Sequence, residues 1–163
     1  MDIWILYTLL RMMQSMDEQL DDYRNLMQIY FNNVVEYAER TLGYTVLEDS
    51  DCVDCCRNDV KIIEIYSLNG VESRLFALLH ECGHALIRRD WTKFKTEFCA
   101  HAEHDGDGRK ETKSLKISTL EEEFEAWKRG WKLAKRLNLQ LDKDAYTKHK
   151  NKYIMTYIEW AAN

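Results

Sequence analysis

The chain has 163 residues, enough for one domain with a substantial core, and its 45% hydrophobic and 31% charged content excludes wholesale disorder and collagen-like repeats. Asp and Glu total 28 against 23 Lys and Arg, and the resulting net charge of -5 argues against non-specific binding to nucleic acid. Five cysteines in a chain without a recognisable secretion signal predict reduced thiols and a cytoplasmic protein. The apolar run 3–10 is too short to span a membrane, so we expect no membrane association.

The first predicted element is helical and covers residues 2–40. Its apolar side chains recur at the three-to-four spacing of an amphipathic helix: Leu20, Tyr23, Met27, Tyr30, Phe31, Val34, Tyr37 and Ala38. Gly43 stands where a glycine commonly ends a helix. We expect a break around Gln14–Asp17, which would divide the segment into two helices that act as a packing scaffold.

A small sheet is predicted next. Residues 44–47 form a short β-prone run, and residues 61–67 alternate polar and apolar side chains as a strand does. The polar segment 48–59 between them carries three of the cysteines and is expected to be a loop. After the second strand, Asn69 is expected to cap a helix, with Glu72 completing a capping-box-like pair.

The rest of the chain is predicted to be helical apart from one loop. Residues 71–88 are apolar almost all round, which indicates a helix buried on more than one side. Residues 101–113 are polar and contain two glycines, which is typical of an exposed loop. Thr119 is expected to cap a helix over 120–137, and Asp142 is expected to cap the last one. Aromatic residues at helical spacing in that last helix are expected in the core: Tyr146, Tyr153, Tyr157 and Trp160.

Together these elements predict a helix-rich α+β fold in a single domain over residues 1–163. A small, few-stranded sheet is expected to pack on the buried helix 71–88. Residues 1–42 would supply a helical scaffold, residues 44–138 the core of the domain, and residues 142–161 a C-terminal helix.

The buried helix contains the run His80-Glu81-Cys82-Gly83-His84. Two histidines four residues apart lie on one face of a helix, so both imidazoles can reach one metal ion, and zinc binds neutral imidazole readily. Glu81 follows the first histidine and can reach a water on the metal but not easily the metal itself, which is the position of a general base. We therefore predict metal ligands in His80 and His84 and a general base in Glu81.

A catalytic zinc takes three protein ligands and leaves one position open, so a third ligand must come from elsewhere in the chain. His101 and His104 are candidates. So are four carboxylates in the helix 120–137: Glu121, Glu122, Glu123 and Glu125.

Helical phase separates these four carboxylates. The predicted core-facing stripe of the helix consists of Leu120, Phe124, Trp127, Trp131 and Ala134. Glu123 lies about 60° from the centre of this stripe, Glu121 about 100°, and Glu122 and Glu125 about 140–160°, toward solvent. Small residues on the side of Glu123 would let the helix approach the histidine helix closely: Ala126, Gly130 and Ala134. Glu123 is therefore the predicted third ligand, and Glu122 is predicted to be a solvated side chain.

The sequence HECGH, followed downstream by Glu-Phe-Glu-Ala-Trp, resembles the gluzincin metallopeptidases. Their pattern is HExxH and then Glu-x-x-Ala-Asp/Asn/Glu on a second helix. The resemblance implies that the two histidines bind zinc, that Glu81 is the general base and that Glu123 is the carboxylate ligand, with Ala126 in the alanine place. Trp127 departs from the pattern, because the polar residue expected there would accept a hydrogen bond from a ligand histidine.

Among gluzincins, the small size and the strand before the helix look similar to the ImmA/IrrE-type peptidase domains encoded by bacteria and their phages. The resemblance covers about residues 60–90 and 119–137. It implies that a sheet edge above the metal helix holds an extended peptide by β-addition, and the strand Ile62–Tyr66 is the candidate for that role.

Two weaker signals lie outside this pattern. Cys52 and Cys55, with Cys99 and the two histidines His101 and His104 further on, could form a second zinc site, but a single CxxC without a clean second pair is a weak signal. We therefore expect one zinc per chain and no structural zinc at Cys52 and Cys55. His101 or His104 could instead stabilise the oxyanion of a tetrahedral intermediate.

The function predicted from the sequence is zinc-dependent hydrolysis of peptide bonds, with a peptide or protein as the substrate. The alternative is a catalytically silent regulatory or binding protein that keeps zinc as a folding element, with a fourth protein ligand such as His101 or Cys99 closing the site. A metal-dependent hydrolase of non-peptide substrates is a third reading. The oligomeric state does not follow from these patterns.

Overall fold

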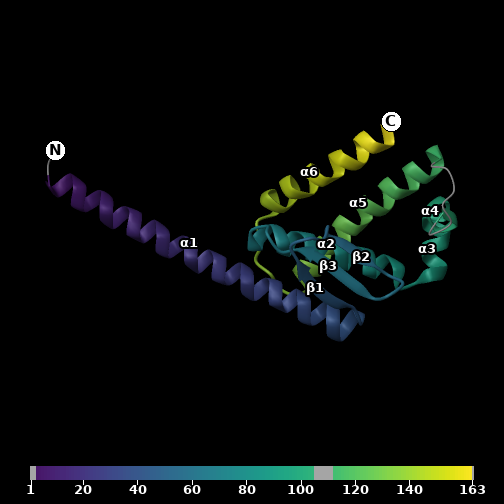
Figure 1. The fold of residues 1–163 in the computed structure, drawn as a ribbon, viewed down its shortest axis with the longest axis horizontal. Coiled ribbons are helices and arrows are strands. Elements are labelled where there is room, and N and C mark those ends of the chain that lie inside the picture. The colour runs from purple at the N-terminus through teal and green to yellow at the C-terminus, as the bar shows by residue number, and fades with distance from the viewer. Residues whose placement is uncertain (1–2, 105–111, 163) are drawn as a thin grey trace.

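The structure, a computed structural model, describes residues 3–104 and 112–162, with side chains for residues 11, 13–102 and 112–162. It confirms the predicted helix-rich α+β class, with a small three-stranded sheet (Figure 1). Within the described ranges, no helix has the length and apolar character that a membrane crossing requires. The elements in chain order are α1 (Ile3–Tyr37), the π-helix η1 (Ala38–Leu42), β1 (Thr45–Asp49), β2 (Cys55–Arg57), β3 (Ile62–Tyr66), α2 (Val71–Arg88), α3 (Trp91–Glu97), α4 (Cys99–His104), α5 (Lys113–Arg136) and α6 (Lys143–Ala162).

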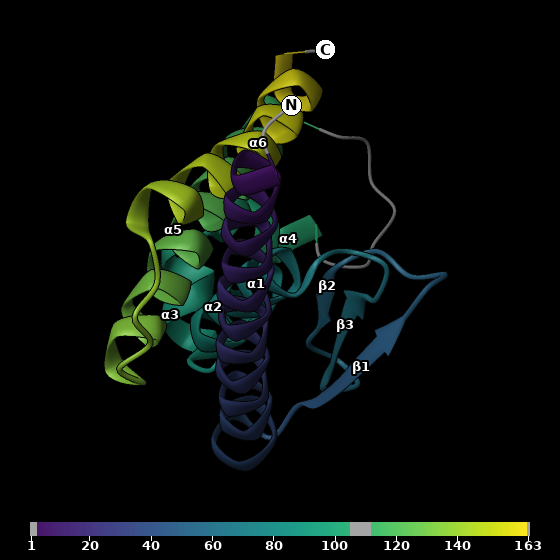
Figure 2. The ribbon, with the colours of Figure 1, turned by 90° about the vertical axis from the view of Figure 1, so that its left-hand side faces the viewer.

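Helix α1 is a single long helix, so the predicted break at Gln14–Asp17 is wrong. That segment contains neither glycine nor proline, and each of its residues tolerates a helical backbone, so nothing in it interrupts the hydrogen bonding. The expected terminator is confirmed: Gly43 adopts the left-handed conformation with φ 76°, and its N–H donates to the carbonyl of Ala38. The first half of the helix projects away from the body of the protein (Figures 1 and 2).

The sheet has the order β1-β3-β2, with β1 parallel and β2 antiparallel to the central strand β3. The strands predicted at 44–47 and 61–67 are confirmed within a residue or two. Strand β2 lies inside the segment 48–59 that was expected to be a loop. Strand β2 has only three residues, which is too short for a hydrophobic period to show in the sequence. It forms because Cys56 can pair with Ile63 on an otherwise open edge of β3. Ile63 and Ile65 are fully buried against α2.

Helix α2 begins after Gly70, and no side chain caps it, so the predicted cap by Asn69 is wrong. The predicted partner Glu72 instead accepts a hydrogen bond from the hydroxyl of Tyr23 in α1. The carboxylate of Glu72 is therefore engaged in a tertiary contact with α1 and not in a local capping pair.

Helix α5 begins a full two turns earlier than predicted. Its cap is Thr112, whose hydroxyl accepts a hydrogen bond from the N–H of Leu115 at 3.1 Å, and Thr119 lies inside the helix. The expected loop 101–113 is correspondingly shorter, since α4 extends to His104, while residues 105–111 lie outside the described residues. The predicted cap of the last helix is confirmed, because Asp142 accepts a hydrogen bond from the N–H of Asp144 at 2.8 Å.

Helices α2 and α5 pack in direct backbone contact, as the small residues of α5 predicted. A Cβ placed on Gly83 of α2 would lie 2.1 Å from the carbonyl oxygen of Ala126, and one on Gly130 of α5 would lie 2.5 Å from that of Leu79. Nothing larger than glycine fits at either position without moving a helix. One predicted core residue is wrong: Phe124 is 47% exposed, and the buried face of α5 consists of Ser118, Glu122, Glu123, Ala126, Trp127, Gly130, Leu133 and Ala134.

We predict that Gly83→Ala destabilises the protein by about 1–3 kcal/mol or more, because the added methyl group forces the two helices apart. Helix propensity alone predicts the opposite sign, a gain of about 1 kcal/mol. Urea unfolding followed by circular dichroism measures the difference. Gly70→Ala is the control, since a Cβ there meets nothing within 4 Å, and we expect a change within about 0.5 kcal/mol. A stability for Gly83→Ala equal to or above wild type would contradict the close packing.

Candidate metal centre

Three side chains predicted as metal ligands meet at the contact between α2 and α5. His80 and His84 extend from successive turns of α2, and their Nε2 atoms lie 3.2 Å apart. Glu123 of α5 lies across from them, with Oε2 3.2 Å from Nε2 of His80 and Oε1 3.4 Å from Nε2 of His84. His80 and Glu123 are buried, and His84 is nearly so. In the described part of the chain, this is the group of His, Cys, Asp and Glu side chains whose atoms converge closely enough to hold a metal ion.

Glu122 contacts one of these three side chains, His84, on the side away from the other two. Its predicted exposure to solvent is wrong. The side chain is only 1% exposed, and Oε1 lies 3.0 Å from Nδ1 of His84. With Nδ1 as the donor of this hydrogen bond, Nε2 of the same ring is left to bind a metal. The guanidinium of Arg88 donates to both carboxylate oxygens at 3.3 Å, and Nδ1 of His101 lies 2.5 Å from Oε2.

The error at Glu122 follows from the stripe that was chosen as the core face of α5. Phe124, at one edge of that stripe, is exposed, and the buried face of α5 is turned from the predicted stripe toward Glu122 and Glu123. A better signal lies in the small residues: Ala126 and Gly130 stand four apart, and the same row continues backwards to Glu122. The residues that allow close packing therefore mark the buried face more reliably than the aromatic ones do.

Burial and the opposing charges set the protonation of the site. Burial lowers the pKa of His80 to about 4, even though its hydrogen bond to Glu123 acts the other way. For His84 burial acts to lower the pKa, but the carboxylates of Glu123 and Glu122 outweigh it and raise the pKa well above its usual value. Burial alone would raise the pKa of both carboxyl groups. Their histidine neighbours reverse this effect and lower the pKa of Glu123 to about 2 and that of Glu122 further.

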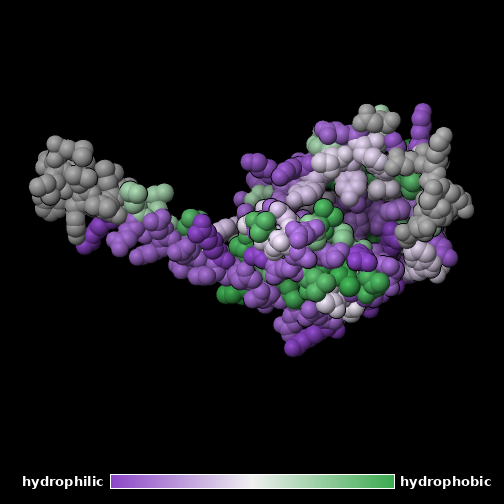
Figure 3. All heavy atoms as spheres, viewed as in Figure 1, coloured by the Kyte–Doolittle hydropathy of each residue, from purple (hydrophilic) through white to green (hydrophobic). Residues whose placement is uncertain are grey.

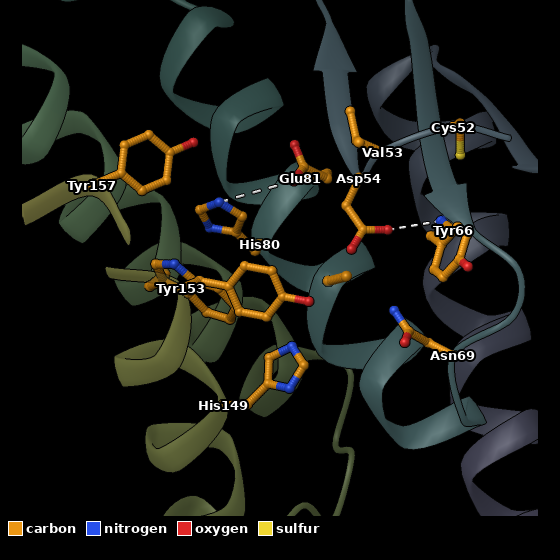
Figure 4. Close-up of a pocket in the computed structure, with 12 residues that line it drawn as sticks. Cys52, Val53, Asp54, Tyr66, Asn69, His80, Glu81, His149, Tyr153 and Tyr157 are labelled. Carbon is orange, nitrogen blue, oxygen red and sulfur yellow. Dashed lines mark hydrogen bonds and ion pairs between the residues drawn. The ribbon is translucent and has the colours of Figure 1, made fainter. Parts of the chain in front are cut away.

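Glu81 is buried beside the three converging side chains without joining them. Its Oε1 lies 3.9 Å from Nε2 of His80, the contact marked by a dashed line in Figure 4. Burial raises the pKa of Glu81 to about 8, against the lowering effect of the nearby His84. Glu81 lines both cavities in front of the site, and it is not a member of the group of side chains that could hold a metal ion.

Trp127 fills the place where the sequence pattern leads one to expect a polar residue. Its ring stacks on the imidazole of His80, with centroids 4.2 Å apart and planes inclined by 16°. Nδ1 of His80 is buried and has no hydrogen-bond partner among the described residues. The two histidines are thus held differently: the ring of Trp127 packs on His80, whereas Glu122 hydrogen-bonds to His84.

A cavity of about 410 Å³ opens in front of His80 and Glu81, between α6 and the segments that flank the sheet (Figure 4). Tyr153, Tyr157 and His149 of α6 form one wall of it. A smaller recess of about 200 Å³ lies over the three converging side chains, and Tyr157 lines both spaces. Of the aromatic residues of this helix that were predicted for the core, Tyr146 is buried there, whereas Tyr153 and Tyr157 line the cavity.

The other predicted site residues lie in different places. His101 lines the recess, held by Glu122, whereas the side chain of His104 lies outside the described residues. The thiols of Cys52 and Cys55 contact the carbonyl of Asp49 and the carboxylate of Glu64. Cys99 is exposed. The described residues bring no metal-binding group together around these cysteines.

No family model, no curated protein and no solved structure matches the chain. The assignment of the site therefore depends on its geometry and on the motif in the sequence.

We predict that Glu123→Ala reduces bound metal to background, whereas Glu121→Ala, in an exposed residue two positions away, leaves it unchanged. Glu122→Gln should weaken metal binding by about 10–100-fold, because His84 loses the carboxylate that orients it. Metal content by mass spectrometry and competition with a chelator measure these effects. Metal retained equally in the Glu123 and Glu121 variants would contradict the ligand assignment.

Proposed function

We propose that the protein is a zinc-dependent peptidase of the gluzincin type, in which His80, His84 and Glu123 bind zinc and Glu81 is the general base. The observation that carries the proposal is the combination of three converging ligand side chains with an adjacent carboxyl group that is not among them. The resemblance of the HECGH motif and the downstream glutamate to gluzincins supports the same reading. The free cysteines support a cytoplasmic location.

The donor set suits zinc. Two imidazole nitrogens and a carboxylate are ligands that zinc favours, at bond lengths of about 2.0–2.2 Å. Two ligands of a tetrahedral ion at that distance lie about 3.3 Å apart. The separations between the Nε2 atoms and the carboxylate oxygens are 3.2, 3.2 and 3.4 Å. Burial also keeps the pKa of His80 low, so this ring is neutral, as a metal ligand must be.

When bound, zinc polarises a scissile carbonyl and lowers the pKa of the attacking water. Glu81 takes a proton from that water as it attacks and passes it to the leaving amine. Tyr157 lines the recess, and in this proposal its hydroxyl donates a hydrogen bond to the carbonyl oxygen as this atom gains negative charge. Burial, and then the neighbouring carboxylate of Glu123, raise the pKa of Tyr157 far above its usual value, so its hydroxyl keeps the proton it must donate.

The topology changes which strand can hold a peptide. Strand β3, the candidate from the sequence, is the central strand of the sheet, and both of its edges are already paired. Strand β2 is an edge strand, and Cys55 and Cys56 line the recess together with His84. We therefore assign substrate pairing to β2, with the larger cavity receiving a substrate side chain next to the scissile bond.

A catalytically silent zinc protein is the main alternative, and two observations weigh against it. A closed structural site needs a fourth ligand, but the group of described residues that could hold a metal has three members. His101, a candidate for the fourth, contacts Glu122 at 2.5 Å, and Cys99 is exposed. A closed site also has no use for a buried carboxyl group at Glu81.

We predict that Glu81→Gln binds zinc as the wild type does and loses peptide hydrolysis, because the base is removed and the ligands are kept. The assay incubates zinc-loaded protein with a mixed peptide library and identifies new termini by mass spectrometry. Hydrolysis by Glu81→Gln at the wild-type rate would contradict the role of Glu81. A wild-type protein that holds zinc and cleaves nothing would instead favour the silent alternative.

We predict that Tyr157→Phe lowers kcat by about 10²-fold without loss of zinc, because one hydrogen-bond donor to the reacting oxygen is removed. Tyr153→Phe is the matched control, since Tyr153 lines the larger cavity but not the recess. A normal kcat in Tyr157→Phe together with a large loss in His101→Phe would transfer this role to His101.

A further inference from the structure

The first half of α1 extends away from the body of the protein, and in Figure 2 it points toward the viewer (Figures 1 and 2). From Arg11 to Leu26, every described side chain is exposed, and burial begins at Met27. Large apolar side chains are nevertheless present on this projecting part, and some reach the surface seen in Figure 3. They are Met13, Met16, Leu20, Tyr23 and Leu26.

These side chains belong to an unbroken heptad pattern. Apolar or aromatic residues alternate at spacings of three and four through the whole of α1, with no exception in ten positions: Leu6, Leu9, Met13, Met16, Leu20, Tyr23, Met27, Tyr30, Val34 and Tyr37. We call this series the heptad stripe. A stripe sustained over several heptads is the pattern with which one helix packs along another as a coiled coil.

The two halves of the heptad stripe are used differently. In the second half, Met27 and Val34 are buried, and Tyr30 and Tyr37 pack against the same core. The body of the protein is thus the packing partner of the stripe from Met27 onward. In the first half the same pattern continues over exposed side chains, of which Tyr23 donates a hydrogen bond to Glu72 of α2. An isolated helix of this length is only marginally stable in water, so a second helix on the stripe would stabilise it.

The position of the body restricts how a second copy can pair. Since the body covers the continuation of the stripe, two parallel copies would bring both bodies to the same place beside the helices. An antiparallel pair over residues 3–26 puts the two bodies at opposite ends. The overlap of 24 residues is about 36 Å long, or slightly more than three heptads.

Charge favours the same orientation. The segment 17–22 contains four acidic residues and no basic one, whereas the segment 7–12 contains Arg11 and no acidic residue. An antiparallel pair that overlaps fully over 3–26 lays segment 17–22 of each copy beside segment 7–12 of the other. A parallel pair would place the two acidic segments side by side, where like charges repel.

We propose that the protein forms an antiparallel homodimer through the first half of α1, with the heptad stripe of each copy as the seam. In the fully overlapping register, Met13 faces the partner's Met16, and position 20 lies at the level of position 9 in the partner. The contact is isologous, so it closes at two copies. It lies far along α1 from the metal centre and does not depend on the proposed peptidase activity (Figure 1).

Light scattering after size-exclusion chromatography tests the dimer. We expect the full-length protein to have twice the chain mass of 19.5 kDa, and Met16→Glu/Leu20→Glu to be a monomer with unchanged metal content. The control Ser15→Glu/Asn25→Glu adds the same charge off the stripe and should remain a dimer. A monomeric wild type at all concentrations, or a control that dissociates as readily as the stripe variant, would overturn the proposal.

Cross-linking tests the orientation. Met13→Cys and Met16→Cys proteins are oxidised separately and as a mixture, with the wild type as the control for its own five cysteines. An antiparallel pair predicts a disulfide-linked dimer in the mixture that neither variant forms efficiently alone. Efficient cross-linking of Met13→Cys alone would show a parallel pair and overturn the proposed arrangement.

Discussion

The backbone contact between α2 and α5 is the constraint on which the rest of the structure depends. Gly83 and Gly130 each leave room for a carbonyl of the other helix, of Ala126 and Leu79 respectively. This separation allows a carboxylate on one helix to lie within 3.4 Å of imidazoles on the other. Side chains with a Cβ at the glycines would keep the helices further apart, and the ligand atoms would no longer converge. The small residues therefore define the candidate metal centre as much as its three converging side chains do.

Close packing also requires the protein to bury charge, and the structure shows how it is compensated. Glu122 lies inside the domain, where an isolated carboxylate would be strongly unfavourable. The guanidinium of Arg88 and the rings of His84 and His101 surround it. The same contacts orient His84 toward the convergence point. One buried carboxylate thus serves both the electrostatics of the helix contact and the geometry of the site.

The front of the site is formed by elements far from α2 in the sequence. Helix α6 is fixed to α5 by the hydroxyl of Tyr146, which donates to the carbonyl of Trp127 at 2.9 Å. This contact positions Tyr153 and Tyr157 at the cavity. On the other side, the edge strand β2 brings Cys55 and Cys56 to the recess. The three candidate ligands are thus covered by two elements whose own sequences give little sign of this role.

The sequence by itself determined the fold class, the helix Val71–Arg88 and the three converging side chains, because helical periodicity and motif spacing are local properties. Only the tertiary structure decided what lies around them. Glu122 is buried because α4 and α2 both pack against its side of α5. Glu72 does not form the expected capping pair, because it accepts a hydrogen bond from Tyr23, 49 positions away. Strand β2 exists because β3 offers it an edge. Each of these depends on contacts between distant segments, whose free energies outweigh the local preferences that a sequence displays.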